Sequence, residues 1–173
     1  MSASEEELNQ ARIKALSSSV RLRILRLCLH AARTNREIAQ LMEMNPATAL
    51  HHVRTLVSTG FLEAQAERPG KQGAREIPYL ATRRSFRQEV PGIAPILIET
   101  LMQEVEGLPP EEIEVTRLGL MLNAEHQAEL RDRLETLTNE YAARPADPDG
   151  SPTSLFMVHH PDRSAISLDP PPN

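Results

Sequence analysis

The sequence is poor in the residues that build disulfides, membrane spans and thiolate metal sites. Its 173 residues include a single cysteine, Cys28, which excludes an intrachain disulfide and any site built from several thiolates. No apolar run approaches the roughly 18 residues that a membrane span requires. The start, MSASEEEL, is acidic and lacks the basic and apolar regions of a signal peptide. We therefore expect a cytoplasmic protein without a membrane partner.

Common enzyme motifs are missing as well. The sequence has no glycine-rich phosphate loop, no G-x-S-x-G and no H-E-x-x-H. Its adjacent histidines do not suggest a metal site: His51 and His52 are about 100° apart on a helix, and His159 and His160 point to opposite faces of a strand. The sequence thus predicts neither an enzyme nor a bound metal or cofactor.

What the chain does have is a strong asymmetry of charge. Residues 12–87 hold 14 Lys/Arg against 5 Asp/Glu, a net charge of +9, whereas residues 88–173 hold 5 against 16, a net charge of -11. A basic block beside an acidic one favours a polyanionic partner for the first block only. If the charge asymmetry is considered by itself, chance clustering of charged residues on solvated faces is the alternative explanation.

Helix signals follow one another through the basic block. A capping box of Ser4 and Glu7 predicts a helix to about Leu16, and the pattern over residues 17–33 predicts a second, with Cys28 on its apolar face. The second helix would place Arg23, Arg26, His30 and Arg33 on one polar face. A third helix over residues 34–44 begins with a capping box of Thr34 and Glu37.

The stretch NPATALHHVRTLVSTGF predicts a fourth helix with clear ends. Asn45 can cap it, Pro46 suits its first position and Gly60 can stop it. About two residues separate it from the third helix, so the pair forms a helix-turn-helix. One side carries Ala49, Val53, Leu56 and Val57, with Leu50 at the rim.

The opposite side of this helix carries short hydrogen-bonding groups. Thr48, His51, Thr55 and Ser58 lie along it, with Ala47, Arg54, His52 and Thr59 at its edges. Such side chains let a helix approach a surface closely, and Thr, His and Arg can contact base edges or phosphates in a major groove. The alternative is an ordinary solvated helix face.

Residues 61–80 then predict a β-hairpin, in which Leu62, Ala64 and Ala66 alternate with polar residues and Pro78 suits an edge strand. Its basic tip carries Arg68, Lys71 and Arg75. A helix-turn-helix followed by such a hairpin is a winged helix, whose tip can reach phosphates or the minor groove.

The second half predicts a helix over residues 93–107, a strand over 111–123, a long helix capped by Asn123 and a final strand over 154–160. The long helix has an apolar stripe of Leu130, Leu134, Leu137 and Tyr141. The remaining Pro-rich tail is expected to be disordered. We thus expect an α+β fold with a winged helix-turn-helix domain (residues 1–87), a helix plus strand-helix-strand unit (88–162) and a tail (163–173).

The stretch NPATALHHVRTLVSTGFLEA resembles the winged helix-turn-helix of ArsR-like bacterial transcriptional regulators, and KALSSSVRLRILRLCL resembles the segment that leads into it. The resemblance covers about Ile13 to Thr82. It implies a homodimer that represses or tunes a promoter through the fourth helix. Many members have serine where this chain has Leu50. The cysteine pairs and the carboxylate and histidine sets of metal-sensing members are not found here.

Together these patterns predict a regulator that binds double-stranded DNA, with a recognition helix at 45–59 and a basic wing at 61–80. The second unit would serve dimerisation or form a pocket for an unknown small-molecule effector. A winged-helix adaptor that binds protein instead of nucleic acid is the rival hypothesis. The predicted DNA-binding residues are Asn45, Ala47, Thr48, His51, His52, Arg54, Thr55, Arg68, Lys71 and Arg75.

Overall fold

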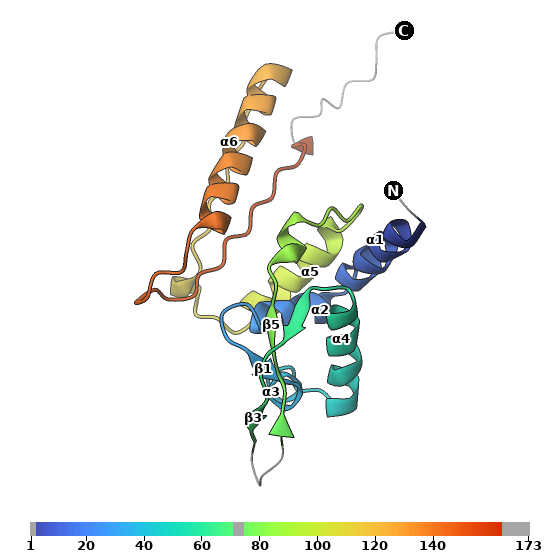
Figure 1. Ribbon diagram of the computed structural model, residues 1–173. Coiled ribbons are helices and arrows are strands. Elements are labelled where there is room, and N and C mark those ends of the chain that lie inside the picture. Colours follow the sequence, from blue (N-terminus) through green and yellow to red (C-terminus); the bar gives the residue numbers. More distant parts are fainter. Residues whose placement is uncertain (1–2, 71–74, 164–173) are drawn as a thin grey trace. The chain divides into compact units, whose positions relative to one another are not determined.

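The computed structural model describes residues 3–70 and 75–163 (Figure 1). The chain divides into two compact units, Met1–Pro109 and Pro110–Asn173. Of the predicted tail, only Arg163 lies within the described residues. No helix in the described part of the chain is long and apolar enough to cross a membrane.

Two of the first unit's helices precede the helix-turn-helix. Helix α1 spans Ala3–Leu16 and α2 spans Ser19–Leu27, where the Ser18 hydroxyl accepts a hydrogen bond from the Arg21 backbone N–H. The predicted continuation of α2 to Arg33 is wrong. Arg33–Thr34 instead form a short strand, β1, which pairs with a strand far along the chain, and this pairing outweighs the local helical pattern.

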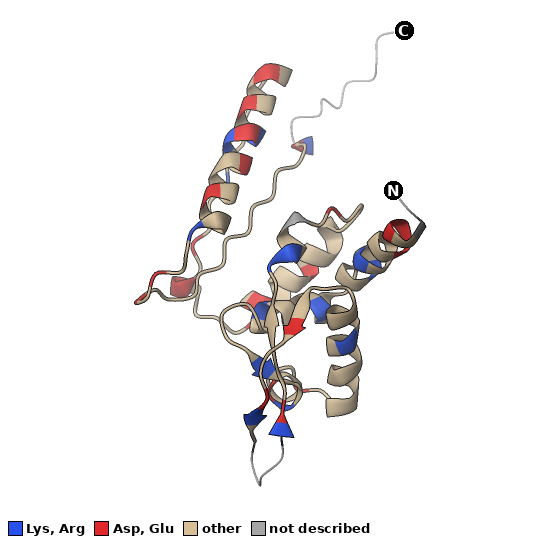
Figure 2. Ribbon diagram, viewed as in Figure 1, with Lys and Arg blue, Asp and Glu red and all other residues tan. Residues whose placement is uncertain are grey.

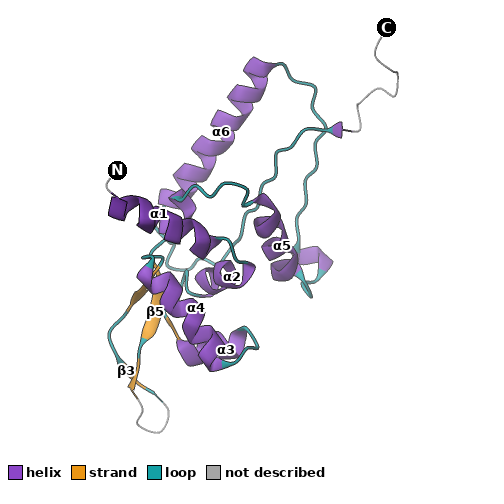
Figure 3. Cartoon of the chain, turned by 90° about the vertical axis from the view of Figure 1, so that its right-hand side faces the viewer, coloured by secondary structure: helices purple, strands orange, loops and turns teal. Residues whose placement is uncertain are grey.

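In the helix-turn-helix the second helix has the predicted ends, whereas the first ends three residues earlier than predicted. Helix α3 spans Asn35–Leu41 and α4 spans Pro46–Ser58. Both halves of the predicted capping box form at Thr34 and Glu37. Figure 3 shows α3 and α4 packed together, with α2 beside them.

The wing consists of two antiparallel ladders. Strands β2 (Leu62–Ala64) and β5 (Pro78–Ala81) pair, and β1 pairs with the other edge of β5, which gives the order β1-β5-β2. Further out, β3 (Arg68–Pro69) pairs with β4 (Arg75–Glu76). Pro78 was expected on an edge strand, which is wrong, because β5 is central. The proline is tolerated because it is the first residue of that strand.

One hydrophobic core unites these elements. Its fully buried side chains come from α1, α2, α3, α4 and β2, with Phe61 before β2, and Cys28 is among them as predicted. Of the alternating positions in the hairpin only Leu62 is buried, whereas Ala64 and Ala66 are exposed. A three-stranded sheet this short has room for few side chains against the helices.

Helix α5 (Ala94–Val105) follows the 3-10 turn η2 (Arg84–Arg87) and packs against α2. Ile93 and Val90, just before it, pack on the core. The first compact unit therefore extends beyond residue 87, where the sequence alone placed the domain boundary, and includes α5.

In residues 110–162 the second unit has a 3-10 turn, η3 (Pro110–Glu112), and one long helix, α6 (Ala124–Ala143), flanked by extended chain. Asn123 caps α6 as predicted. The strands predicted over 111–123 and 154–160 do not form in the described residues. Two strands alone are marginal in water, and the structure gives them no third strand to pair with.

No residue in the described part of the second unit is buried. Leu130 and Leu134 of the α6 stripe are half-buried, whereas Leu137 and Tyr141 are exposed. In the extended segments Val115 is 80% exposed, Met121 92% and Leu155 71%. The described residues of this unit, in a single copy, therefore form no hydrophobic core.

Candidate nucleic-acid interface

Helix α4 is fixed at both ends by local chemistry. The Asn45 side-chain carbonyl accepts a hydrogen bond from the Ala47 backbone N–H at 2.8 Å, which satisfies one of the free donors of the first turn. Gly60 follows the helix with φ +76°, a left-handed conformation that glycine adopts without strain. The Asn35 amide donates to the Pro46 carbonyl at 3.0 Å, so the start of α3 also holds the start of α4.

The two faces of α4 divide as the sequence predicts, except at Val57 and Thr59. Ala49, Val53 and Leu56 are fully buried, and Leu50 is half-buried at the rim. Val57 was assigned to the buried side but is 37% exposed. The helix is therefore seated through a narrow apolar stripe, which leaves a wide outward surface.

That outward surface contains every predicted contact residue of the helix. Thr48, His51 and Arg54 are exposed, as are Asn45 and Ala47, whereas His52 and Thr55 are half-buried. Thr59, predicted at its edge, is buried, and its hydroxyl donates to the Thr55 carbonyl at 2.8 Å.

Polar groups of the outward surface differ in whether they are already engaged with the helix backbone. The Thr55 hydroxyl donates to the His51 carbonyl at 3.1 Å and the Ser58 hydroxyl donates to the Thr55 carbonyl at 3.0 Å. The Arg54 guanidinium, in contrast, has no hydrogen-bond or ion-pair partner among the described residues. A positively charged fork on an otherwise short-chained face is suited to a base edge or a phosphate.

His52 differs from its neighbour His51. Its Nδ1 atom is buried and has no hydrogen-bond partner in the described part of the chain. Burial lowers the pKa of His52, and the nearby charges of Arg21 and His51 lower it further. The ring is thus held in its neutral form near pH 7, which suits a hydrogen bond better than an ion pair with a phosphate.

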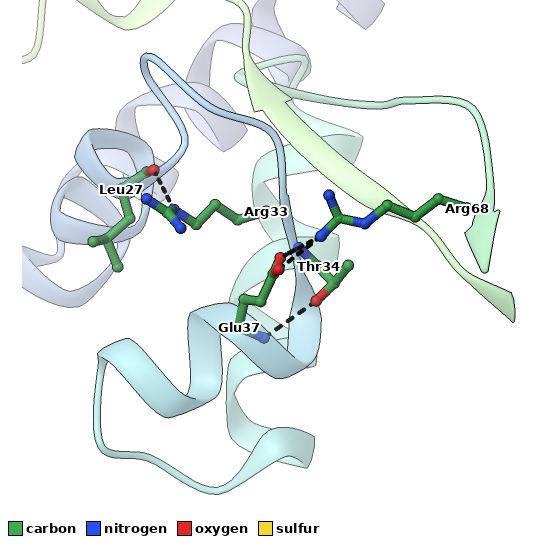
Figure 4. A network of polar contacts seen from close by, with 5 residues as sticks. All are labelled: Leu27, Arg33, Thr34, Glu37 and Arg68. Carbon is green, nitrogen blue, oxygen red and sulfur yellow. Dashed lines mark hydrogen bonds and ion pairs between the residues drawn. The ribbon is translucent and has the colours of Figure 1, made fainter. Parts of the chain in front are cut away.

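The wing cations are in two different situations. Arg75 forms an ion pair at 3.1 Å with Glu67 of the same hairpin, and its side chain is 84% exposed. Arg68 is held by Glu37 at the start of α3, at 2.7 Å from one carboxylate oxygen and 2.8 Å from the other (Figure 4). Lys71 lies outside the described residues.

Figure 2 shows basic residues of the first unit on α2, on α4 and on both strands of the β3–β4 ladder, and mostly acidic ones along α6. Some of these cations serve the fold: Arg12 Nε donates to the Thr59 carbonyl at 3.2 Å, and Arg21 donates to the Ala15 and Lys14 carbonyls. These two guanidinium groups keep their charge, but they are engaged with the backbone and are less free to contact a ligand directly.

Sequence reasoning missed two features of this surface. Arg36 follows Asn35 on α3 and is exposed, so it adds a cation to the surface of the helix-turn-helix. The pairing of Arg68 with Glu37 joins residues 31 positions apart, and no local pattern could have indicated it. In the part of the chain that is described, no group of three or more His, Cys, Asp or Glu side chains could hold a metal ion.

Comparison with known proteins supports the predicted helix-turn-helix. A model of a helix-turn-helix domain family matches residues 16–65, so that part of the prediction is confirmed. A search of curated proteins gave no match.

Several solved structures are similar to the chain. A possible transcriptional regulatory protein from Mycobacterium bovis has 25% identity over 61% of this chain and 97% of that chain, with a TM-score of 0.40. An ArsR-like transcriptional regulator from Rhodococcus sp. RHA1 has 16% identity over 82% and 100%, with a TM-score of 0.38. The homodimeric winged helix-turn-helix DNA-binding domain of Mb0332 from Mycobacterium bovis, a possible ArsR-family regulator, has 27% identity over 68% and 97%, with a TM-score of 0.37.

Proposed function

We infer that the protein is a DNA-binding transcriptional regulator of the ArsR-like winged helix-turn-helix kind, acting in the bacterial cytoplasm rather than as an enzyme. The observation that carries this is the outward surface of α4. It is exposed, it is built from short polar side chains, and its Arg54 is without a partner among the described residues. A helix seated by an apolar stripe with such a surface can enter the major groove.

The contact residues divide by what they can recognise. Thr48, His51 and Arg54 lie along the outward surface of α4 and would contact base edges, with His52 and Thr55 at its margin. Asn45 and Ala47 at the start of α4 would approach a phosphate, because a helix N-terminus favours anions. In the wing, Arg75 and Lys71 would contact phosphates beside the groove.

Duplex binding as a function of salt tests this function. If about six phosphates are neutralised, the logarithm of the binding constant falls against the logarithm of salt with a slope near -5. Arg54→Ala would weaken specific binding by about 1–3 kcal/mol. Arg131→Ala, which removes an exposed arginine of the acidic second unit, is the matched control and would change nothing. Binding that does not vary with salt would refute the function and favour a winged-helix protein adaptor.

We also propose that the protein acts as a homodimer whose second units cover each other. One α4 reads only a few base pairs, whereas two related by a two-fold axis, about 34 Å apart on DNA, double the contacts. The second unit has no buried residue of its own in the described range. Large exposed apolar surface of this kind marks an association surface.

The distribution of charge allows two copies of the second unit to meet through their extended segments. Residues 110–173 carry 12 Asp/Glu against 5 Lys/Arg, so two copies repel each other in general. The segment 151–160, with Leu155 and Val158 exposed, contains no Asp, Glu, Lys or Arg, and 113–122 contains one of each sign. These segments can therefore meet while the carboxylates of α6 remain in water.

A matched pair of substitutions tests this pairing by light scattering. Leu118→Glu places a charge in the exposed apolar segment, and Thr136→Glu adds the same charge at an exposed position of α6. We expect the first variant to be monomeric and the second to remain dimeric at micromolar concentration. A dimer in both variants would remove the second unit from the interface. A small-molecule pocket would then become the leading role for that unit.

A further inference from the structure

Arg68 and Glu37 connect the outer ladder of the wing to the helix-turn-helix. The Arg68 Nη2 atom donates to both carboxylate oxygens of Glu37, at 2.7 and 2.8 Å (Figure 4). Among the described residues this is the ion pair that joins the β3–β4 ladder to α3, since Arg75 pairs within the hairpin. The contact therefore ties the outer wing to the element that carries α4.

Glu37 is itself held in place by the backbone. Its carboxylate accepts a hydrogen bond from the Thr34 backbone N–H at 2.7 Å, while the Thr34 hydroxyl accepts one from the Glu37 N–H at 3.2 Å. Thr34 is buried, so the carboxylate is anchored on the core. The Thr34 backbone hydrogen bond is the largest cause that lowers the pKa of Glu37, and the Arg68 charge lowers it further.

Arg75 offers a direct contrast within the same wing. Its partner Glu67 lies in the same hairpin, the contact is single and 3.1 Å long, and the arginine is 84% exposed. Arg68 has two contacts with a carboxylate that also accepts the Thr34 backbone hydrogen bond, and the Arg68 side chain is 44% exposed. A phosphate can therefore take Arg75 with little loss, but it must compete with Glu37 for Arg68.

We propose that Glu37 is a positioning residue for DNA binding, which holds Arg68 on α3, fixes the wing relative to α4 and withdraws this arginine from the phosphate contacts. This rests on the proposed function. Arg68 was predicted as a phosphate contact, and here it becomes the wing's anchor. An arginine that stays paired with a protein carboxylate neutralises no phosphate, so it releases none of the counterions condensed on the DNA and adds nothing to the salt dependence.

The experiment measures binding of full-length protein to a fluorescent duplex of mixed sequence between about 50 and 200 mM salt. Four variants are compared: Arg68→Ala, Arg75→Ala, Glu37→Gln and Glu67→Gln. Glutamine at position 37 can still accept the capping bond but lacks the charge that holds Arg68. Thermal unfolding of each variant, followed by circular dichroism, confirms that it is folded.

Each variant has a distinct expected result. Arg75→Ala makes the salt slope shallower by about 0.9, the value of one phosphate, whereas Arg68→Ala leaves the slope within about 0.3 of wild type, less than half of that value. Glu37→Gln releases Arg68, which steepens the slope by about 0.9 and tightens binding to this mixed-sequence duplex. Glu67→Gln, which removes the same charge from the other wing pair, changes the slope little.

A double variant separates the specific effect from the general loss of a negative charge. If Glu37 acts through Arg68, then Glu37→Gln has no effect on the slope in the Arg68→Ala background. A slope that becomes shallower in Arg68→Ala, with no change in Glu37→Gln, would overturn the proposal. If Glu37→Gln fails to fold, the comparison of Arg68→Ala with Arg75→Ala decides alone. Absence of salt-dependent binding by the wild type would instead refute the proposed function itself.

Discussion

Removal of α5 should destabilise the winged helix, although the sequence alone places the domain boundary before it. Two truncations test this, one ending at Pro109 and one ending at Phe86. The first keeps the compact unit Met1–Pro109 intact. The second removes Val90, which is 8% exposed, and helix α5, which packs on α2.

The size of the effect follows from the side chains that are lost. Full burial of one Val, Leu or Ile contributes roughly 1.5–3 kcal/mol. Val90 is nearly fully buried, and the half-buried Ile and Leu side chains of the removed segment are Ile93, Ile96, Leu97 and Leu101. At about 1.5 kcal/mol for Val90 and about 1 kcal/mol for each of the others, the loss is about 5.5 kcal/mol. This is an upper value, because an unfolded chain already buries part of its surface.

A loss of this size is comparable with the whole stability of a small domain, which is about 5–15 kcal/mol. For a domain of this length each kcal/mol shifts the midpoint of thermal unfolding by about 4–8 °C. We therefore expect the chain ending at Phe86 to unfold roughly 20–40 °C below the chain ending at Pro109. Circular dichroism in the far ultraviolet measures both. Midpoints within a few degrees of each other would refute the assignment of α5 to the core.

Three further predictions concern single residues. Cys28 is fully buried, and burial raises the pKa of its thiol to about 12. A thiolate-reactive reagent should therefore label Cys28 only when the protein unfolds. Labelling at the rate of a free thiol would show that this core opens in the native state. Gly60→Ala forces a side chain into φ +76° and should cost about 1–2 kcal/mol, whereas Gly119→Ala, for which no positive φ occurs, should leave the unfolding midpoint unchanged. The pKa of His52 is depressed in the folded state, so the unfolded state binds the proton first as pH falls. The contribution of His52 to the free energy of unfolding should therefore be fully present above pH 6.5, the ordinary His value, and should decline below it. His52→Gln should flatten that decline in acid denaturation, and an unchanged decline would mean that this ring does not control it.

The helix-turn-helix could be predicted from sequence because its signals are local. Thr34 and Glu37 form the capping box that their spacing predicts. Asn45 and Gly60 act at the two ends of α4 as expected. Each of these signals depends on residues within a few positions of one another, so one sequence suffices to find them.

What could not be predicted depends on contacts between distant residues. Strand β1 has only two residues and exists because it pairs with β5. The same pairing ended α2 early and made Pro78 part of a central strand. Arg68 looked like a free wing cation, but Glu37, 31 positions earlier, holds it. A surface charge can be counted from sequence, but its partner cannot.

The second unit shows the same limit in another form. Its alternating apolar residues predict strands, yet Val115 and Leu155 are exposed and no strand forms in its described residues. An alternating pattern predicts that one face of the chain is buried, but it does not identify the surface that buries it. In a homodimer the missing surface belongs to the other copy, which one chain cannot supply. The order of the second unit would then depend on protein concentration, and so would the affinity for a two-fold site, because the two α4 helices bind together only when the pair has formed.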